Sequence, residues 1–91
     1  MNKAEFVEKI SKKMSVTKSS AEHFVDAAVE IIQETVAKGD EVKIVGFGTF
    51  DQSLRQKRNG RNPKTGQPIT IPASRVPRFR PGKDFRSRVD V

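Results

Sequence analysis

The chain has 91 residues, of which 34% are hydrophobic, and a formal net charge of +7 at pH 7. This length allows one domain with a thin core, because so small a chain buries only roughly 60–70% of its unfolded surface. The absence of cysteine excludes a disulfide framework and a thiolate metal site. No apolar run is long enough for a membrane span or a signal peptide, so we expect a cytoplasmic protein with no membrane partner.

Two amphipathic helices are expected at the start of the chain. Asn2, with Glu5 three residues later, has the spacing of a capping box, and an apolar stripe at helical spacing follows. Thr17 is the preferred cap of a second helix with a broad apolar face, although Ser19, with Glu22 three residues later, has the better capping-box spacing. Lys38 is expected in its last turn, and Gly39 suits the left-handed position that follows a helix. These elements predict a helical hairpin.

The hydrophobic period then changes from 3.6 to 2, which predicts short strands. The string Gly46-Phe47-Gly48 interrupts them as a tight connection or a bulge. Bulky aromatic side chains in this part have too little cover within one small chain, so we expect a core shared between two subunits. Its predicted members are Phe47, Phe50 and Phe79. A short last helix is expected from Lys83 to Val89, with Phe85 and Val89 facing inward.

The charge is concentrated in the second half of the chain. Residues 1–54 carry seven Lys or Arg and nine Asp or Glu, a net −2, whereas residues 55–91 carry eleven and two, a net +9. Between Asp51 and Asp84 no acidic residue occurs. A polyanion is the natural partner of this segment, because each Lys or Arg that meets a phosphate releases condensed counterions. Strand-like residues and turn punctuation disfavour the alternative of a disordered basic tail.

A basic two-stranded ribbon is expected around the turn between Asn62 and Gly66. Three prolines in the returning part of the chain cannot donate backbone hydrogen bonds, so they fit edge strands. The turn carries Pro63 between two cations, Arg61 and Lys64. An apolar wedge on a basic turn is what a DNA-bending protein inserts between base steps. The alternative is that Pro63 only forms the turn.

No pattern in the chain predicts an enzyme. His23 is the only histidine, and a position on the surface or boundary of the second helix accounts for it. The acidic residues of that helix recur every four positions, which is typical of a solvated face: Glu22, Asp26, Glu30 and Glu34. No His, Asp or Glu cluster has metal-ligand spacing, and no phosphate-cradling glycine string is present. We therefore expect no metal and no cofactor.

Three strings of residues resemble the bacterial HU/IHF family of histone-like DNA-bending proteins. They are Val45-Gly46-Phe47-Gly48-Thr49-Phe50, Gly60-Arg61-Asn62-Pro63-Lys64-Thr65-Gly66 and Phe79-Arg80-Pro81-Gly82-Lys83. The resemblance covers the whole chain and implies an α+β fold in an intertwined dimer. The parts it implies are a helical dimerisation part (1–39), a saddle-shaped antiparallel sheet (40–54 and 75–82), a protruding β-ribbon arm (55–74) and a C-terminal helix (83–91).

The resemblance also implies a function. The family's members are architectural proteins of the bacterial nucleoid that bind and bend double-stranded DNA along the minor groove, and bent, nicked or kinked DNA costs less to bind. Pro63 matches the intercalating residue of the arm tip, and the three phenylalanines named above match the dimer core. The DNA-binding residues indicated by charge and resemblance together are Lys3, Arg55, Lys57, Arg58, Arg61, Asn62, Pro63, Lys64, Arg75, Arg78, Arg80 and Lys83.

The branch of the family stays open at this point. The start Met1-Asn2-Lys3 looks HU-like, which implies a homodimer with little sequence preference. The end of the chain after Phe79 is more similar to an IHF subunit, which implies preferred sites and a heterodimer with a paralogue. A basic RNA-binding module is a further alternative, but the arm has no aromatic residue on which bases could stack, which counts against it. RNA also remains possible as a secondary partner of an HU-like protein. A membrane-surface helix would need a basic polar face, whereas the second helix has an acidic one.

Overall fold

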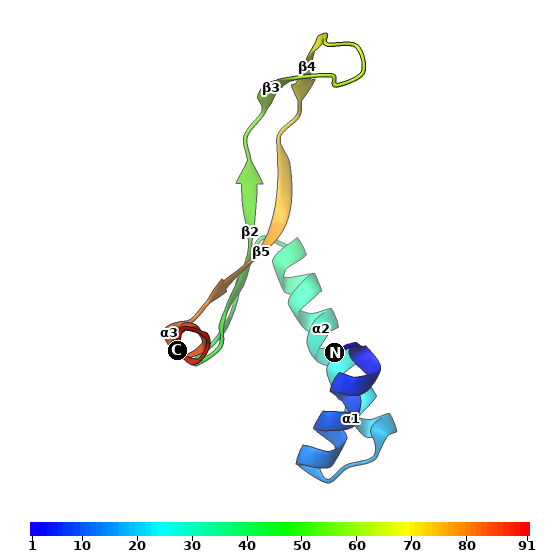
Figure 1. Ribbon diagram of the computed structural model, residues 1–91. Helices are drawn as coiled ribbons and strands as arrows, with labels where there is room; N and C mark the ends of the chain where they lie inside the picture. Colours follow the sequence, from blue (N-terminus) through cyan, green and yellow to red (C-terminus); the bar gives the residue numbers. More distant parts are fainter. The chain divides into compact units, whose positions relative to one another are not determined.

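The computed structural model describes residues 1–91, which divide into two compact units, Met1–Glu34 and Thr35–Val91. The elements in chain order (Figure 1) are α1 (Lys3–Met14), α2 (Lys18–Ala37), β1 (Val42–Ile44), β2 (Gly48–Arg55), β3 (Arg58–Arg61), β4 (Pro68–Ile71), β5 (Ser74–Pro81) and α3 (Lys83–Val89). This order agrees with the predicted α+β class. None of the helices combines the length and the apolar character that crossing a bilayer requires.

The first unit is a helical hairpin with a very small core. The predicted caps are confirmed: Asn2 Oδ1 accepts a hydrogen bond from the Glu5 amide at 2.9 Å, and Thr17 Oγ1 accepts one from the Ser20 amide at 3.1 Å. Each satisfies an amide that the first turn of a helix leaves without a partner. The buried apolar side chains between α1 and α2 are Val7, Ala21 and Val25, with Ile10 packed against them.

The end of α2 belongs to the second unit. Gly39 has a φ of +94°, and the amides of Gly39 and Asp40 return to the carbonyls of Val36 and Thr35 at 3.0 and 3.1 Å. This left-handed termination was predicted. The placement of Lys38 was wrong by one residue, because α2 ends at Ala37. The Gln52 side-chain amide donates to the Val36 carbonyl at 2.8 Å and ties β2 to this helix end.

The second unit contains an antiparallel sheet in the order β1-β2-β5. The register pairs Phe50 with Phe79 and Gly48 with Pro81. The predicted tight connection is confirmed as a turn between β1 and β2, closed by a 3.0 Å hydrogen bond from the Phe47 amide to the Ile44 carbonyl. Gly48 is buried, and a Cβ there would lie 2.6 Å from the Arg80 carbonyl oxygen and from the Phe79 ring, so only glycine fits.

An aromatic cluster of Phe47, Phe50, Phe79 and Phe85 covers one face of this sheet. The Phe47 ring centroid lies 5.0 Å from that of Phe79 and 5.4 Å from that of Phe85, and the Phe50 and Phe79 centroids are 4.7 Å apart. Such separations suit offset or tilted ring packing. Phe85 thus faces inward from α3 as predicted. Val89, one turn further, is 69% exposed, contrary to the prediction, because no side chain of this chain covers the end of α3.

Candidate nucleic-acid interface

The ribbon of β3 and β4 extends the antiparallel β2–β5 pair and ends in the turn that contains Pro63 (Figure 1). Asn62 organises this turn. Its backbone amide donates to the Gln67 carbonyl at 2.8 Å, and its backbone carbonyl accepts from the Gly66 amide at 2.7 Å. Its side-chain Oδ1 accepts from the backbone amide of Lys64 at 2.9 Å. Gly66 adopts a φ of +70°. Pro63 and Lys64 are exposed, so the turn presents an apolar ring and a cation to solvent.

The two arginines of the ribbon lie on opposite faces. The register pairs Arg58 with Ile71 and Arg61 with Pro68, and successive side chains of a strand point to opposite faces. The face of Arg58 also carries Ile69, which is 42% exposed. The ribbon therefore offers cations on both sides, with little apolar packing between its strands.

The other predicted cations of the arm, and Arg75 at the adjoining end of the sheet, are also exposed. Lys57 lies in the short break between β2 and β3, and Arg55 and Arg75 belong to the ends of β2 and β5 nearest the ribbon. None of the ion pairs in the structure involves an arm residue. The arm therefore keeps its full positive charge available for an external anion.

A second group of cations lies on the sheet, on the face opposite the aromatic cluster. The cations are Arg55, Arg78 and Arg80, and together with Asp51 they form what we call the polar sheet face. Cross-strand pairing of Asp51 with Arg78 places both on the same side. Arg75 pairs with Leu54 and lies on the aromatic side instead. The interface residues predicted on β5 are thus divided between the two faces.

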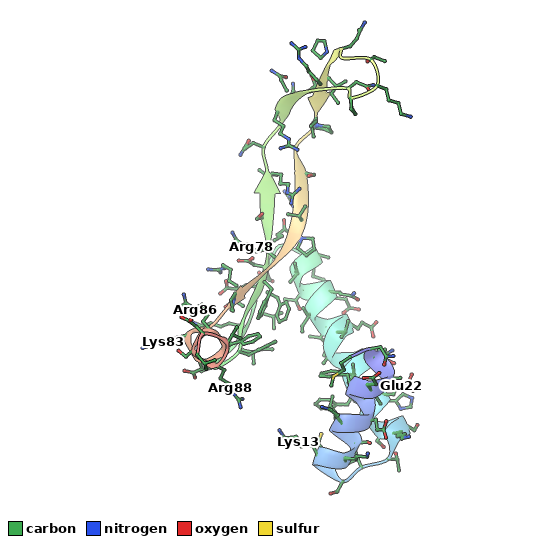
Figure 2. The ribbon with its side chains drawn as sticks, in the orientation of Figure 1. Lys13, Glu22, Arg78, Lys83, Arg86 and Arg88 are labelled. Carbon is green, nitrogen blue, oxygen red and sulfur yellow. The ribbon has the colours of Figure 1, made fainter.

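Asp51 holds two of these arginines. Arg78 donates from Nε and Nη2 to the two carboxylate oxygens at 2.8 and 2.9 Å, and Arg80 Nη2 lies 2.9 Å from Oδ2 in an ion pair. Hydrogen bonds from Arg78 in particular lower the pKa of the Asp51 carboxyl, and the same bonds raise the pKa of Arg78. Arg80 also lies 3.7 Å from Glu41 Oε2. Arg78 is labelled on the sheet in Figure 2.

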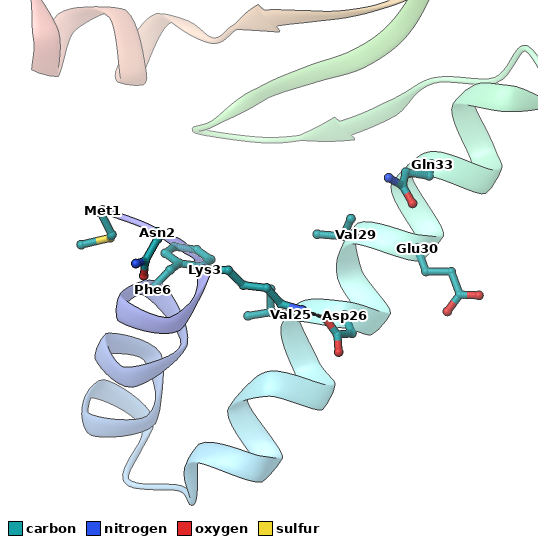
Figure 3. Close-up of a pocket in the computed structure, with 9 residues that line it drawn as sticks. All are labelled: Met1, Asn2, Lys3, Phe6, Val25, Asp26, Val29, Glu30 and Gln33. Atoms are coloured by element: carbon teal, nitrogen blue, oxygen red, sulfur yellow. Dashed lines mark ion pairs between the residues drawn. The ribbon is translucent and has the colours of Figure 1, made fainter.

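Lys3 and Lys83, the predicted contacts outside the sheet and arm, have different surroundings. Lys3 Nζ lies 2.6 Å from Asp26 Oδ1, and this hydrogen bond raises the pKa of Lys3. The pair borders a groove of the first unit that also contains Phe6 and Val29 (Figure 3). Lys83 begins α3, where Arg86 and Arg88 are also exposed (Figure 2).

Sequence reasoning missed the role of Asp51. From the sequence alone, Asp51 was only the residue at which the acid-free segment begins. Its place next to Phe50 in an alternating strand indicated the face opposite the core. Its partner Arg78 lies 27 residues away across the arm, and no local pattern reports that register. The two arginines of α3 were likewise left out of the predicted interface, although the net charge of the second half included them.

Comparison with known proteins gives consistent matches over the full chain. The family model for bacterial DNA-binding proteins matches residues 1–90. DNA-binding protein HU of Nostoc sp. is 51% identical over 98% of this chain and 95% of its own length, and the HU of Clostridium pasteurianum is 44% identical over 99% of each. A cocrystal structure of Anabaena HU with DNA matches with a TM-score of 0.94 at 50% identity, over 98% of this chain and 97% of that one. HU of Thermotoga maritima matches with a TM-score of 0.70 at 31% identity, over 98% of both chains.

Proposed function

Because this chain belongs to the bacterial HU/IHF family of DNA-binding proteins, we propose that it is an architectural protein of the nucleoid that binds double-stranded DNA and bends it through its arms in the minor groove. The family is non-enzymatic, and so is the function of this chain. The observation that carries the bending proposal is an arm whose cations have no anionic partner and whose exposed tip presents Pro63.

Phosphate contacts supply affinity with little base specificity, because they do not depend on sequence. Cations on both faces of the ribbon suit a groove with a phosphate backbone on each side. The proposed contacts include the arm cations together with Lys3, Arg78, Arg80 and Lys83. Bending a site of 20–30 base pairs by 40–90° costs roughly 1–6 kcal/mol, and contacts on the body of the protein repay that cost. Nicked or kinked DNA costs less to bend and should bind more tightly.

The binding unit is proposed to be a homodimer. One chain leaves several large apolar side chains exposed, among them Phe6 at 48%, Phe24 at 58% and Ile31 at 59%. Phe47, which touches three other rings, is still 40% exposed. Monomeric soluble proteins rarely leave so much apolar surface open. A second copy of the chain that covers the helical groove and the aromatic cluster accounts for the exposed apolar side chains of the helices and for the exposed Phe47. Such a dimer also places two arms on one DNA.

HU-like binding with little sequence preference is favoured over IHF-like binding, since the full-length relatives named above are HU proteins. Footprinting on a long duplex tests this choice. Uniform protection supports the HU-like function, whereas protection concentrated at a few sites supports the IHF-like alternative and calls for a search for a partner paralogue.

A competition experiment tests the function as a whole. Labelled duplex DNA is displaced from the protein by unlabelled duplex, nicked duplex or RNA of the same length. Nicked duplex should compete best and RNA worst. Equal competition by duplex DNA and RNA would overturn DNA bending as the basis of affinity and favour a general basic binding module.

A further inference from the structure

The three charged side chains at the centre of the polar sheet face form a single unit. The Asp51 carboxylate accepts hydrogen bonds from Nε and Nη2 of Arg78, and its Oδ2 also forms an ion pair with Nη2 of Arg80 at 2.9 Å. Two guanidinium groups thus converge on one oxygen atom. Without the carboxylate, their like charges would repel at this separation, and both long side chains would regain rotamer freedom.

Exposure separates the carboxylate from the guanidinium groups. The Asp51 side chain is 14% exposed, whereas those of Arg78 and Arg80 are 47% and 54% exposed. The carboxylate is therefore largely covered, whereas about half of each arginine side chain remains open to solvent. A guanidinium group has five N–H donors, and Arg78 uses only those of Nε and Nη2 on Asp51.

We propose that Asp51 is a positioning residue that holds Arg78 and Arg80 as a preformed two-guanidinium fork for one phosphodiester group of bound DNA. Arginine recognises phosphate through paired, planar N–H donors, so the orientation of the group decides how many hydrogen bonds form. Ordering the two side chains during folding removes that entropic cost from the binding step. This inference rests on the proposed DNA-binding function and adds a role for an acidic residue within it.

The proposal predicts that removal of the Asp51 charge weakens DNA binding, whereas the change in net charge alone would strengthen it. Asp51→Asn raises the net charge of each subunit by one, which by itself would tighten binding to DNA. If Asp51 positions the fork, the same change weakens binding by about three- to tenfold, within the range of coupling between contacting residues. The salt dependence should become shallower, because a phosphate contact is lost. Asp51→Glu, which keeps the carboxylate, should restore part of the affinity.

Glu41 provides the matched control. It is also an acidic residue beside Arg80, but its contact is longer, at 3.7 Å, and its side chain is 58% exposed. Glu41→Gln removes the same unit of charge without releasing the fork. Its affinity for DNA should equal or exceed that of the parent protein.

The experiment measures the affinity of the dimer for a short nicked duplex by fluorescence anisotropy at several salt concentrations. The variants are Asp51→Asn, Asp51→Glu, Glu41→Gln, the pair Arg78→Ala with Arg80→Ala, and that pair combined with Asp51→Asn. Loss of Asp51 should weaken binding by the parent, but in the background that lacks both arginines it should leave the affinity equal or slightly higher, because only the change in net charge remains. Thermal unfolding of each variant shows whether the fold is intact.

Two results would overturn the proposal. The first is Asp51→Asn binding as tightly as the parent or more tightly, which makes Asp51 a mere opposing charge. The second is an equal loss with and without the two arginines, which makes it a structural residue only. Different results would show that the proposed DNA-bending function itself is wrong. The parent protein would then show no preference for nicked duplex, and Arg58→Ala in the arm would leave the affinity for DNA unchanged.

Discussion

The sheet and the arm are continuous in the chain but are stabilised differently. Around Gly48 and Phe79 the sheet is held by four packed rings, by a strand contact that leaves no room for a Cβ, and by the Asp51 ion pairs. The ribbon of β3 and β4 has backbone pairing, a turn ordered by Asn62 and partly exposed isoleucines. Isolated two-stranded ribbons are marginal in water. Stability thus resides in the sheet, while the arm keeps its side chains available for a ligand.

The largest expected effect is that of salt on DNA binding, which depends on the charge of the arm. Unfolding depends on the packing of the sheet and should respond to salt much less. If a dimer meets about 6–10 phosphates, affinity for DNA should fall roughly 10³- to 10⁵-fold between 50 and 200 mM salt. Thermal unfolding of the free protein should change little over the same range, because its core is apolar. Anisotropy titrations and melting curves on one preparation check both statements. An affinity that is flat with salt would exclude phosphate contacts as the main source of binding.

Phe47→Ala and Ile69→Ala test whether the stability of the protein resides in the sheet and not in the ribbon. Phe47 and Ile69 are almost equally exposed in one chain, at 40% and 42%. Burial of a phenylalanine contributes roughly 1.5–3 kcal/mol, so Phe47→Ala should weaken folding and dimerisation together. Ile69→Ala, on the ribbon, should change the free energy of unfolding by less than about 0.5 kcal/mol.

Denaturant unfolding and sedimentation measure these effects. If the protein is the proposed homodimer, the midpoint for the parent should rise with protein concentration, since folding and association are then coupled. A well-folded monomer at micromolar concentration would contradict the dimer. An equal loss in both variants would contradict the assignment of stability to the sheet.

Pro63→Ala tests whether the tip of the arm bends DNA. The change removes no charge, so the salt dependence of binding should stay nearly the same. The bend should decrease, because proline fixes φ in the turn and is proposed to supply the apolar wedge between base steps. Energy transfer between dyes at the two ends of a short duplex, at saturating protein, measures the bend. If the variant bends DNA as much as the parent, Pro63 is only a turn former.

The sequence predicted local features of this fold better than its long-range pairing. The caps at Asn2 and Thr17, the glycine after α2 and the inward Phe85 all follow from spacing within a few residues, and all are confirmed. The Asp51–Arg78 pairing depends on a register set across the whole arm, which no local pattern encodes. The exposed end of α3 at Val89 depends on what covers it, and helical spacing does not report that.

Lys64→Ala gives the smallest expected effect and separates charge from shape at the arm tip. Lys64 and Pro63 are neighbours in one turn and both are exposed, so the two substitutions disturb the same place. Removal of one phosphate contact should weaken binding uniformly across DNA sequences and lower the salt slope by about one for each arm that loses the contact. The bend at saturation should stay close to that of the parent, since Pro63, the proposed wedge, is retained. A bend lost in Lys64→Ala with an unchanged salt slope would mean that the lysine shapes the turn and that the charge of the tip contributes nothing to binding.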